Sequence, residues 1–101
     1  MRAMITGASG FIGSRLAAHL VDQDVSVVKV RHRALKRDFA DVGEVVSKIE
    51  PDIIFHLAGT YQSPHSSEMI EANCLFAAKL LDAMRLQKMK CRIVMMGSAA
   101  E

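Results

Sequence analysis

A glycine-rich segment near the N-terminus is the part of this sequence whose residue types and spacing most clearly indicate chemistry. Gly7, Gly10 and Gly13 lie three residues apart, between the apolar segment 3–6 and a stretch with helical periodicity. A helix that starts at such a turn offers open backbone N–H groups and the positive end of its dipole to an anion, such as the pyrophosphate of a dinucleotide. In this arrangement Gly7 permits the tight turn, Gly10 lets the phosphates approach the backbone, and Gly13 allows close packing of helix on strand. The spacing predicts a phosphate-binding loop, with a plain strand-to-helix turn as the alternative.

The elements that must position this loop alternate along the whole chain. Strands are expected at 3–6, 25–30, 52–56 and 92–96, and helices from residue 12, from 41 to Pro51 and from about 67 to 87. Asp41 and Glu44 resemble a capping box at the start of the second helix, and Pro51 should end it. The strand at 25–30 is too apolar to have a solvent-facing side. Near-continuous apolar strands separated by helices indicate a parallel sheet covered on both faces, which is a doubly wound α/β fold.

Composition limits the class of protein. The chain has 101 residues, 50% of them hydrophobic and 24% charged, and a net charge of +2, which fits one domain with a single core. Cys74 and Cys91 lack metal-ligand spacing, so we expect no metal site, no disulfide framework and reduced thiols. Apolar runs are far shorter than the ~18 residues of a membrane span, and no signal-peptide pattern opens the chain. We therefore expect a cytoplasmic protein with no membrane partner.

The segment from Thr6 to Gly13, with its G-x-x-G-x-x-G spacing, resembles the cofactor fingerprint of extended short-chain dehydrogenases/reductases, the NAD(P)-dependent nucleotide-sugar epimerase/dehydratase family. The resemblance continues in order through 38–41, 51–59, Asn73 and 97–101. Segments 53–59 and 91–98 look most like the GDP-6-deoxymannose reductase and GDP-mannose dehydratase branch. The resemblance implies that 1–101 form the N-terminal part of an NAD(P)-binding, Rossmann-like domain. The sheet would then stop after about the fourth or fifth strand, with the other catalytic and substrate-binding parts absent.

The resemblance also implies which residues contact the cofactor. It assigns contacts to the glycine loop and to the chain after His56, namely to Gly7, Ser9, Gly10, Phe11, Ile12, Gly13, Leu57, Ala58 and Gly59. Ala58 and Gly59 are small enough for the riboses to lie against the backbone. His56 itself is expected to pack rather than react, since a single histidine ending an apolar strand is usually a core residue.

Two further positions carry polar groups that the family uses. Asp38 would hydrogen-bond the adenine amino group, with the backbone of Phe39 beside it, unless Asp38 is only a turn residue before the next helix. Asn73 interrupts an apolar helical stretch, so its amide needs a partner. The family has an asparagine here that ties neighbouring strand ends together near the cofactor, and a solvent-facing amide is the alternative.

Ser98 follows the last expected strand, where the family has the Ser/Thr that hydrogen-bonds the substrate hydroxyl or carbonyl. Its partners in the family are a tyrosine acid/base and a lysine four residues further on. The only tyrosine here is Tyr61, and the residue four places later is His65. By the resemblance, Ser98 is the catalytic residue of this chain, and the tyrosine and lysine would come after Glu101.

Basic residues after the second strand bear on the choice of cofactor. Arg31 lies 24 residues after Gly7, close to where NAD-specific enzymes carry an acidic residue that binds the ribose hydroxyls. An arginine can instead pair with a 2′-phosphate. We therefore expect NADP(H) rather than NAD, held by Arg31 with Arg33 or Arg37, and a solvated basic loop is the alternative. Nucleic-acid binding by this cluster is not expected, because Phe39 is its only aromatic neighbour.

The residues after Ser98 narrow the reaction. Family dehydratases follow the Ser/Thr with acidic residues, since loss of water needs a general acid and a base. Ala99 and Ala100 occupy those places, so we expect a nucleotide-sugar 4-ketoreductase first, an epimerase second and a dehydratase third. A dinucleotide-binding regulatory module without chemistry is the alternative from another class. The 101-residue piece by itself should lack activity and self-associate through an apolar sheet edge.

Overall fold

The structure, a computed structural model, describes residues 1–30, 41–57 and 76–96. The elements run in the order β1 (Arg2–Thr6), α1 (Phe11–Asp22), β2 (Ser26–Val30), α3 (Asp41–Ile49), β3 (Ile53–His56), α5 (Phe76–Leu86) and β4 (Arg92–Met95). Strands and helices alternate as the sequence predicted. Of the long helix expected at 67–87, the segment before Phe76 lies outside the described residues.

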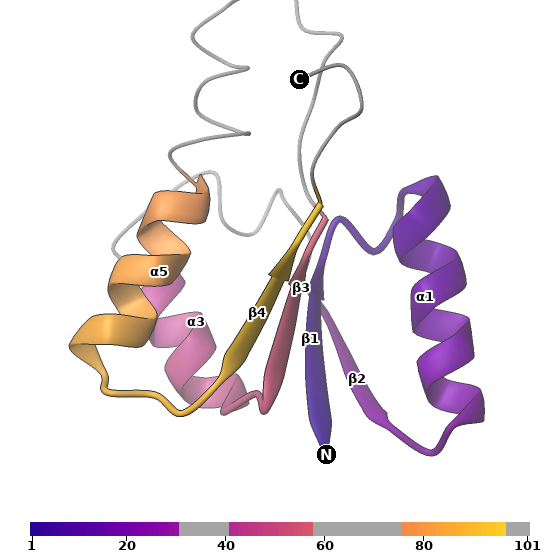
Figure 1. The fold of residues 1–101 in the computed structure, drawn as a ribbon, viewed down its shortest axis with the longest axis horizontal. Coiled ribbons are helices and arrows are strands. Elements are labelled where there is room, and N and C mark those ends of the chain that lie inside the picture. Colours follow the sequence, from indigo (N-terminus) through magenta and orange to yellow (C-terminus); the bar gives the residue numbers. More distant parts are fainter. Residues whose placement is uncertain (31–40, 58–75, 97–101) are drawn as a thin grey trace, which may run out of the picture.

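All described strands are parallel and form one sheet in the order β2-β1-β3-β4. Helix α1 packs on one face of this sheet, and α3 and α5 pack on the other (Figure 1). The doubly wound, Rossmann-like arrangement is therefore confirmed. Because the strands are parallel, their carboxyl ends meet at one edge of the sheet, which is also the edge where β1 connects to α1 (Figure 1).

The alternation of side chains along β1 divides the core into two clusters. Met4 points to the side of α3 and α5, where it packs with Ile54 of β3 and Leu80 of α5, all fully buried. Ile5 points to the other side and packs with Ala17 of α1. This period-two division is what a strand buried on both faces requires.

Helix α3 follows the predicted apolar periodicity. Val42 and Val46 are buried, while Val45 and Ile49 are half-buried on the same side. The helix ends at Ile49, because Glu50 takes a left-handed conformation (φ 50°) and Pro51 follows.

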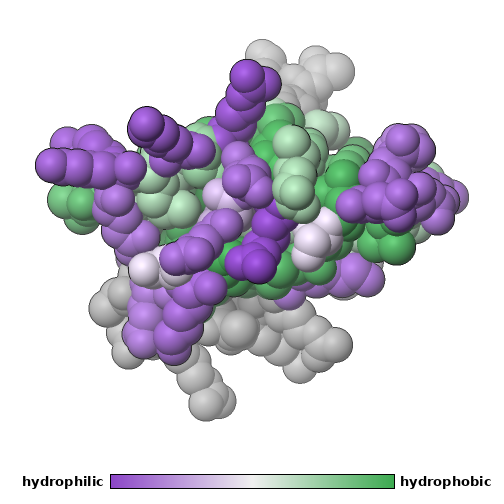
Figure 2. All heavy atoms as spheres, turned by 90° about the horizontal axis from the view of Figure 1, so that it is seen from below, coloured by the Kyte–Doolittle hydropathy of each residue, from purple (hydrophilic) through white to green (hydrophobic). Residues whose placement is uncertain are grey.

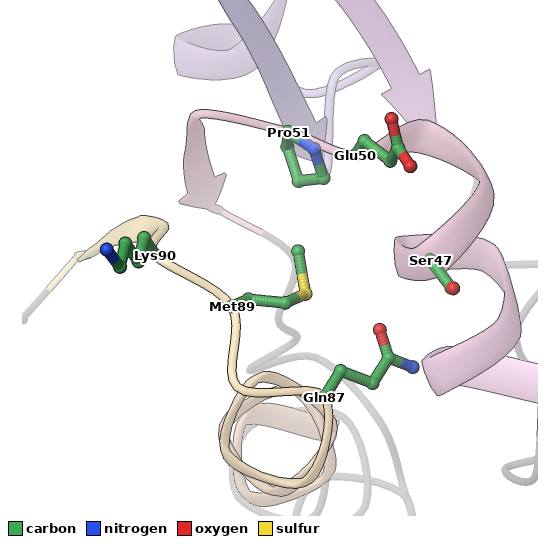
Figure 3. Close-up of a pocket in the computed structure, with 6 residues that line it drawn as sticks. All are labelled: Ser47, Glu50, Pro51, Gln87, Met89 and Lys90. Carbon is green, nitrogen blue, oxygen red and sulfur yellow. The ribbon is translucent and has the colours of Figure 1, made fainter.

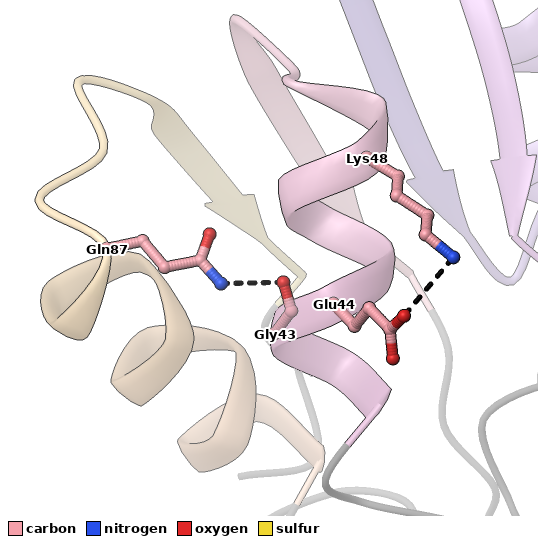
Figure 4. A network of polar contacts seen from close by, with 4 residues as sticks. All are labelled: Gly43, Glu44, Lys48 and Gln87. Carbon is pink, nitrogen blue, oxygen red and sulfur yellow. Dashed lines mark hydrogen bonds and ion pairs between the residues drawn. The ribbon is translucent and has the colours of Figure 1, made fainter.

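Polar contacts at both ends tie α3 to the rest of the molecule, and an ion pair lies within the helix. Close to its start, the Gln87 side-chain amide donates to the carbonyl of Gly43 over 2.6 Å and links α3 to the end of α5 (Figure 4). Glu44 and Lys48 form an exposed ion pair at 3.2 Å on the outer side. At the other end, the Arg2 guanidinium donates to the last helical carbonyl, that of Ile49.

The expectation of a fully covered second strand was wrong. Ser26 and Lys29 of β2 are exposed, and Val27 and Val28 are only half-buried. The physical reason is position in the sheet, since within the described residues β2 pairs only with β1 and α1 covers it only in part.

The opposite end of the molecule is the edge where the strands begin. Seen from there, hydrophilic side chains project over much of the surface, with apolar side chains between them (Figure 2). None of the helices in the described ranges is long and apolar enough to span a membrane.

Candidate functional site

The glycine loop joins the carboxyl end of β1 to the start of α1, and its conformation depends on glycine at the first position. Gly7 has a φ of 71°, in the left-handed region that side chains with a Cβ rarely adopt. The Gly10 N–H then donates to the Gly7 carbonyl over 3.1 Å and closes the turn. Gly10 is the N-cap of α1, in an extended conformation that any residue can adopt.

The start of α1 is open to an anion. Within residues 1–30 no side chain caps this helix end, and its first turn contains no acidic residue. The Ser14 N–H donates to the Gly10 carbonyl over 2.9 Å, so the N–H groups of Phe11, Ile12 and Gly13 precede the first intrahelical bond. A capping side chain usually satisfies such groups. Their availability, together with the helix dipole, gives this end of α1 the donors and the positive potential that a phosphate needs.

Gly13 is required by close packing rather than by a special conformation. A Cβ at this position would lie 2.2 Å from the Gly7 carbonyl oxygen and 2.9 Å from the Ala8 Cα. At Gly10 the same atom would meet, among the described residues, only the Gly7 oxygen, at 3.3 Å, and Gly10 is exposed. The structure therefore confirms the predicted role of Gly7 in the turn. It also confirms that Gly13 allows close packing, although against the loop backbone of Gly7 and Ala8 rather than against the strand.

The neighbouring strand end forms the second side of the candidate site. The Leu57 N–H donates to the Thr6 carbonyl at 3.2 Å and to Thr6 Oγ1 at 3.1 Å, which holds the chain after β3 against the chain before Gly7. Leu57 also packs against the core cluster of Ile5 and Ala17, which includes Ala8 of the loop. His56 is buried, as expected, and its Nδ1 lies 2.7 Å from Thr6 Oγ1.

Sequence reasoning named Thr6 only as the first residue of the fingerprint, without a role of its own, and did not single out Arg15. Thr6 was detectable as the one hydroxyl at the end of the apolar segment 3–6. The Arg15 guanidinium stacks over the Phe11 ring, 3.7 Å from its centroid, in the first turns of α1. The signal for this contact is the spacing of four residues between an aromatic and a cation. Arg15 adds a positive charge on the side of the helix start where Phe11 is 75% exposed.

The predicted site residues divide into two groups. The glycine loop with Ser9, Phe11 and Ile12, and Leu57 across from it, lie together at the carboxyl edge of the sheet, where open α/β sheets bind ligands. The other predicted residues lie outside the described ranges, and their roles stay predictions: Arg31, Arg33, Asp38, Phe39, Ala58, Gly59, Asn73 and Ser98. Strands β2, β3 and β4, which precede most of them, end at this same edge.

Two other features lie away from this edge. A hollow of about 510 Å³ is lined by residues from the ends of α3 and α5, namely Ser47, Glu50, Pro51, Gln87, Met89 and Lys90 (Figure 3). Cys91, at the start of β4, has a raised pKa because burial disfavours its thiolate and the Asp52 carboxylate adds to the effect. In the described part of the chain no three His, Cys, Asp or Glu side chains are grouped to hold a metal.

Comparisons with known proteins agree with this geometry. The sequence profile of the NAD dependent epimerase/dehydratase family matches residues 3–101. The chain is 27% identical to CDP-paratose 2-epimerase of Salmonella typhi, over 93% of this chain and 36% of that protein. It is 30% identical to UDP-2-acetamido-2,6-beta-L-arabino-hexul-4-ose reductase of Pseudomonas aeruginosa, over 84% of this chain and 22% of that protein.

A solved structure shares the fold over nearly the whole chain. A UDP-rhamnose synthase of Acanthamoeba polyphaga mimivirus superposes with a TM-score of 0.82 and 25% identity, over 98% of this chain and 37% of that one. The chain thus spans 36% and 22% of the lengths of the two curated relatives.

Proposed function

Because this chain belongs to the NAD-dependent epimerase/dehydratase family, we propose that residues 1–101 form the N-terminal part of an NAD(P)-binding domain in a nucleotide-sugar 4-ketoreductase. The observation that carries the proposal is the open start of α1, where a left-handed Gly7 and an uncapped helix present N–H groups to an anion. A pyrophosphate fits this arrangement of donors, because it brings negative charge to the positive end of the helix dipole.

The substrate class is supported by the two curated relatives. By their names, one acts on a CDP-linked sugar and the other reduces a UDP-linked hexul-4-ose. A reductase of that kind converts a 4-keto group to an alcohol. We place an epimerase second, because the first of these relatives is one.

The roles that we propose for the chain's own residues rest on the open start of α1 for the glycine loop and on the family resemblance of the sequence for Ser98. When bound, the nicotinamide would supply the hydride that reduces the ketone, and the tyrosine acid/base that the family uses would supply the proton that completes the alcohol. The loop from Gly7 to Gly13 holds the pyrophosphate, and Ser98 donates a hydrogen bond to the substrate carbonyl. Ala99 and Ala100 cannot transfer protons, so this segment does not supply the acid and base that dehydration requires.

The test is a turnover assay on the purified protein in its natural full length. We expect consumption of NADPH with a 4-keto-6-deoxy nucleotide sugar, and no release of water from the unmodified nucleotide hexose. Ser98→Ala should lower kcat by roughly 100-fold through loss of one hydrogen bond to the developing oxyanion, with little change in NADPH affinity. Efficient dehydration of the hexose by the wild-type protein would refute the assignment.

A second expectation concerns the cofactor, and we propose NADP(H) over NAD. One or two charge-assisted bonds from Arg31 and Arg33 to the 2′-phosphate should favour NADPH by ~10-fold or more, at ~1.5–3 kcal/mol each. Arg31→Ala should therefore weaken NADPH binding by about 10-fold and leave NADH binding nearly unchanged. Both affinities are measured by fluorescence titration.

Lys29 provides the matched control for this prediction. It is exposed on β2, two residues before Arg31, and its replacement removes the same charge. Lys29→Ala should leave the ratio of the two affinities unchanged. Equal or tighter binding of NADH by the wild-type protein would argue against the proposed 2′-phosphate contact.

A further inference from the structure

A buried polar contact joins the carboxyl ends of β1 and β3, next to the candidate site. Thr6 Oγ1 and His56 Nδ1 lie 2.7 Å apart although the residues are 50 positions apart in the sequence. Thr6 is 1% exposed and His56 6% exposed, and the two residues face each other in the parallel register. Buried polar groups are costly unless they are paired, so this contact fixes both side chains in direction as well as in distance.

The same hydroxyl also holds the backbone beyond β3. The Leu57 N–H donates to Thr6 Oγ1 at 3.1 Å as well as to the Thr6 carbonyl at 3.2 Å. The hydroxyl accepts from Leu57 and shares one hydrogen bond with His56 Nδ1, in which the hydroxyl is the donor when the ring proton is on Nε2. Thr6 is the last residue of β1, and Gly7, the next residue, begins the loop.

We propose that Thr6 and His56 are positioning residues that set the place of the glycine loop relative to the Leu57 backbone. An apolar pair could fill the same space, but it could not fix the backbone segments that follow β1 and β3 relative to each other. The proposal rests on the proposed function for the identity of the ligand that the loop holds. The effect of Thr6 and His56 on the position of the glycine loop does not depend on that function.

Four variants separate hydrogen bonding from packing. Thr6→Val keeps the shape of the side chain and removes the hydroxyl, and His56→Leu removes the acceptor. Thr6→Ser keeps the hydroxyl, and His56→Asn keeps an acceptor close to the position of Nδ1. The first pair should disturb the site, and the second pair should preserve most of it.

The first readout is amide hydrogen exchange in the ligand-free, full-length protein. Thr6→Val and His56→Leu should speed exchange at Leu57 and at Gly10, whose N–H closes the loop, by about 10-fold more than at Ile54 in the centre of β3. Thr6→Ser and His56→Asn should exchange within about threefold of the wild type. In the double variant Thr6→Val/His56→Leu the effects should not add, because the two residues act as one unit.

The second readout is NADPH affinity, with Val46→Ala as the control. Val46 is fully buried in the cluster under α3, and its truncation should lower stability without touching the loop. We expect Thr6→Val and His56→Leu to weaken NADPH binding by about 5- to 20-fold, because the glycine loop loses one hydrogen bond that holds it in place. Val46→Ala should bind NADPH as the wild type does.

Two results would overturn the positioning role. One is exchange at Gly10 and Leu57 that stays equal to the wild type in Thr6→Val. The other is that Val46→Ala speeds hydrogen exchange at these two amides as much as Thr6→Val does. The Thr6–His56 contact would then contribute only to the overall stability of the protein. Failure of the wild-type protein to bind any dinucleotide, with the exchange effects present, would instead refute the proposed function and leave the positioning of the loop supported.

Discussion

Alanine in place of Gly13 is expected to destabilise the protein by about 3 kcal/mol and to abolish dinucleotide binding, because overpacking against backbone has no easy relief. The added Cβ would stand 2.2 Å from the Gly7 carbonyl oxygen and 2.9 Å from the Gly7 carbon. These atoms belong to the loop backbone, so α1 would have to move away from the loop. Alanine gains about 1 kcal/mol of helix propensity over glycine, which is too little to offset the clash. Urea unfolding and NADPH titration measure the two effects.

Gly43 gives a matched control for this substitution. It also lies in a helix, but a Cβ there would approach the flexible Gln87 amide at 3.2 Å and the Ala83 Cβ at 3.8 Å. Gln87 is exposed and can move, so the gain in helix propensity and the loss of its bond to Gly43 should nearly cancel, within about 1 kcal/mol. A Gly13→Ala protein as stable as Gly43→Ala would contradict the close packing of α1 on the loop.

The local features of this fold could be predicted from sequence because each depends on neighbouring residues. Spacings of three and four residues predicted α1 and the buried side of α3, and Pro51 marked the end of α3 correctly. The glycine loop was predicted for the same reason, since its turn, helix start and packing are set within residues 7–13.

Features that depend on distant pairing were missed or misjudged. The burial of β2 was overestimated, because an apolar segment does not reveal how many strands or helices will cover it. The pairing of Thr6 with His56 needs the parallel register of β1 and β3, which no local pattern contains. The expectation that His56 packs in the core was correct, but its polar partner could only be found once the strands were aligned.

Gly10→Ala is expected to leave the fold intact and to weaken dinucleotide binding by roughly 100-fold, close to 3 kcal/mol. Gly10 has a φ of −75° and a ψ of 174°, so alanine fits its backbone conformation. In the described part of the chain its Cβ would meet only the Gly7 oxygen, at 3.3 Å, and it would project beside the start of α1. This is where a phosphate must approach the N–H groups of α1.

Gly43→Ala also serves as the control for this variant, since it adds the same methyl group in α3, away from the glycine loop. It should bind NADPH as the wild type does. The free energy of unfolding of Gly10→Ala should stay within about 1 kcal/mol of the wild-type value, because the tight contact with the Gly7 oxygen can relax by a few tenths of an ångström. The two variants would then distinguish two roles of glycine in this loop. Gly13 is needed for packing, and Gly10 only for ligand binding. Wild-type affinity in Gly10→Ala would place the phosphates elsewhere and remove the main support for a dinucleotide at this edge of the sheet.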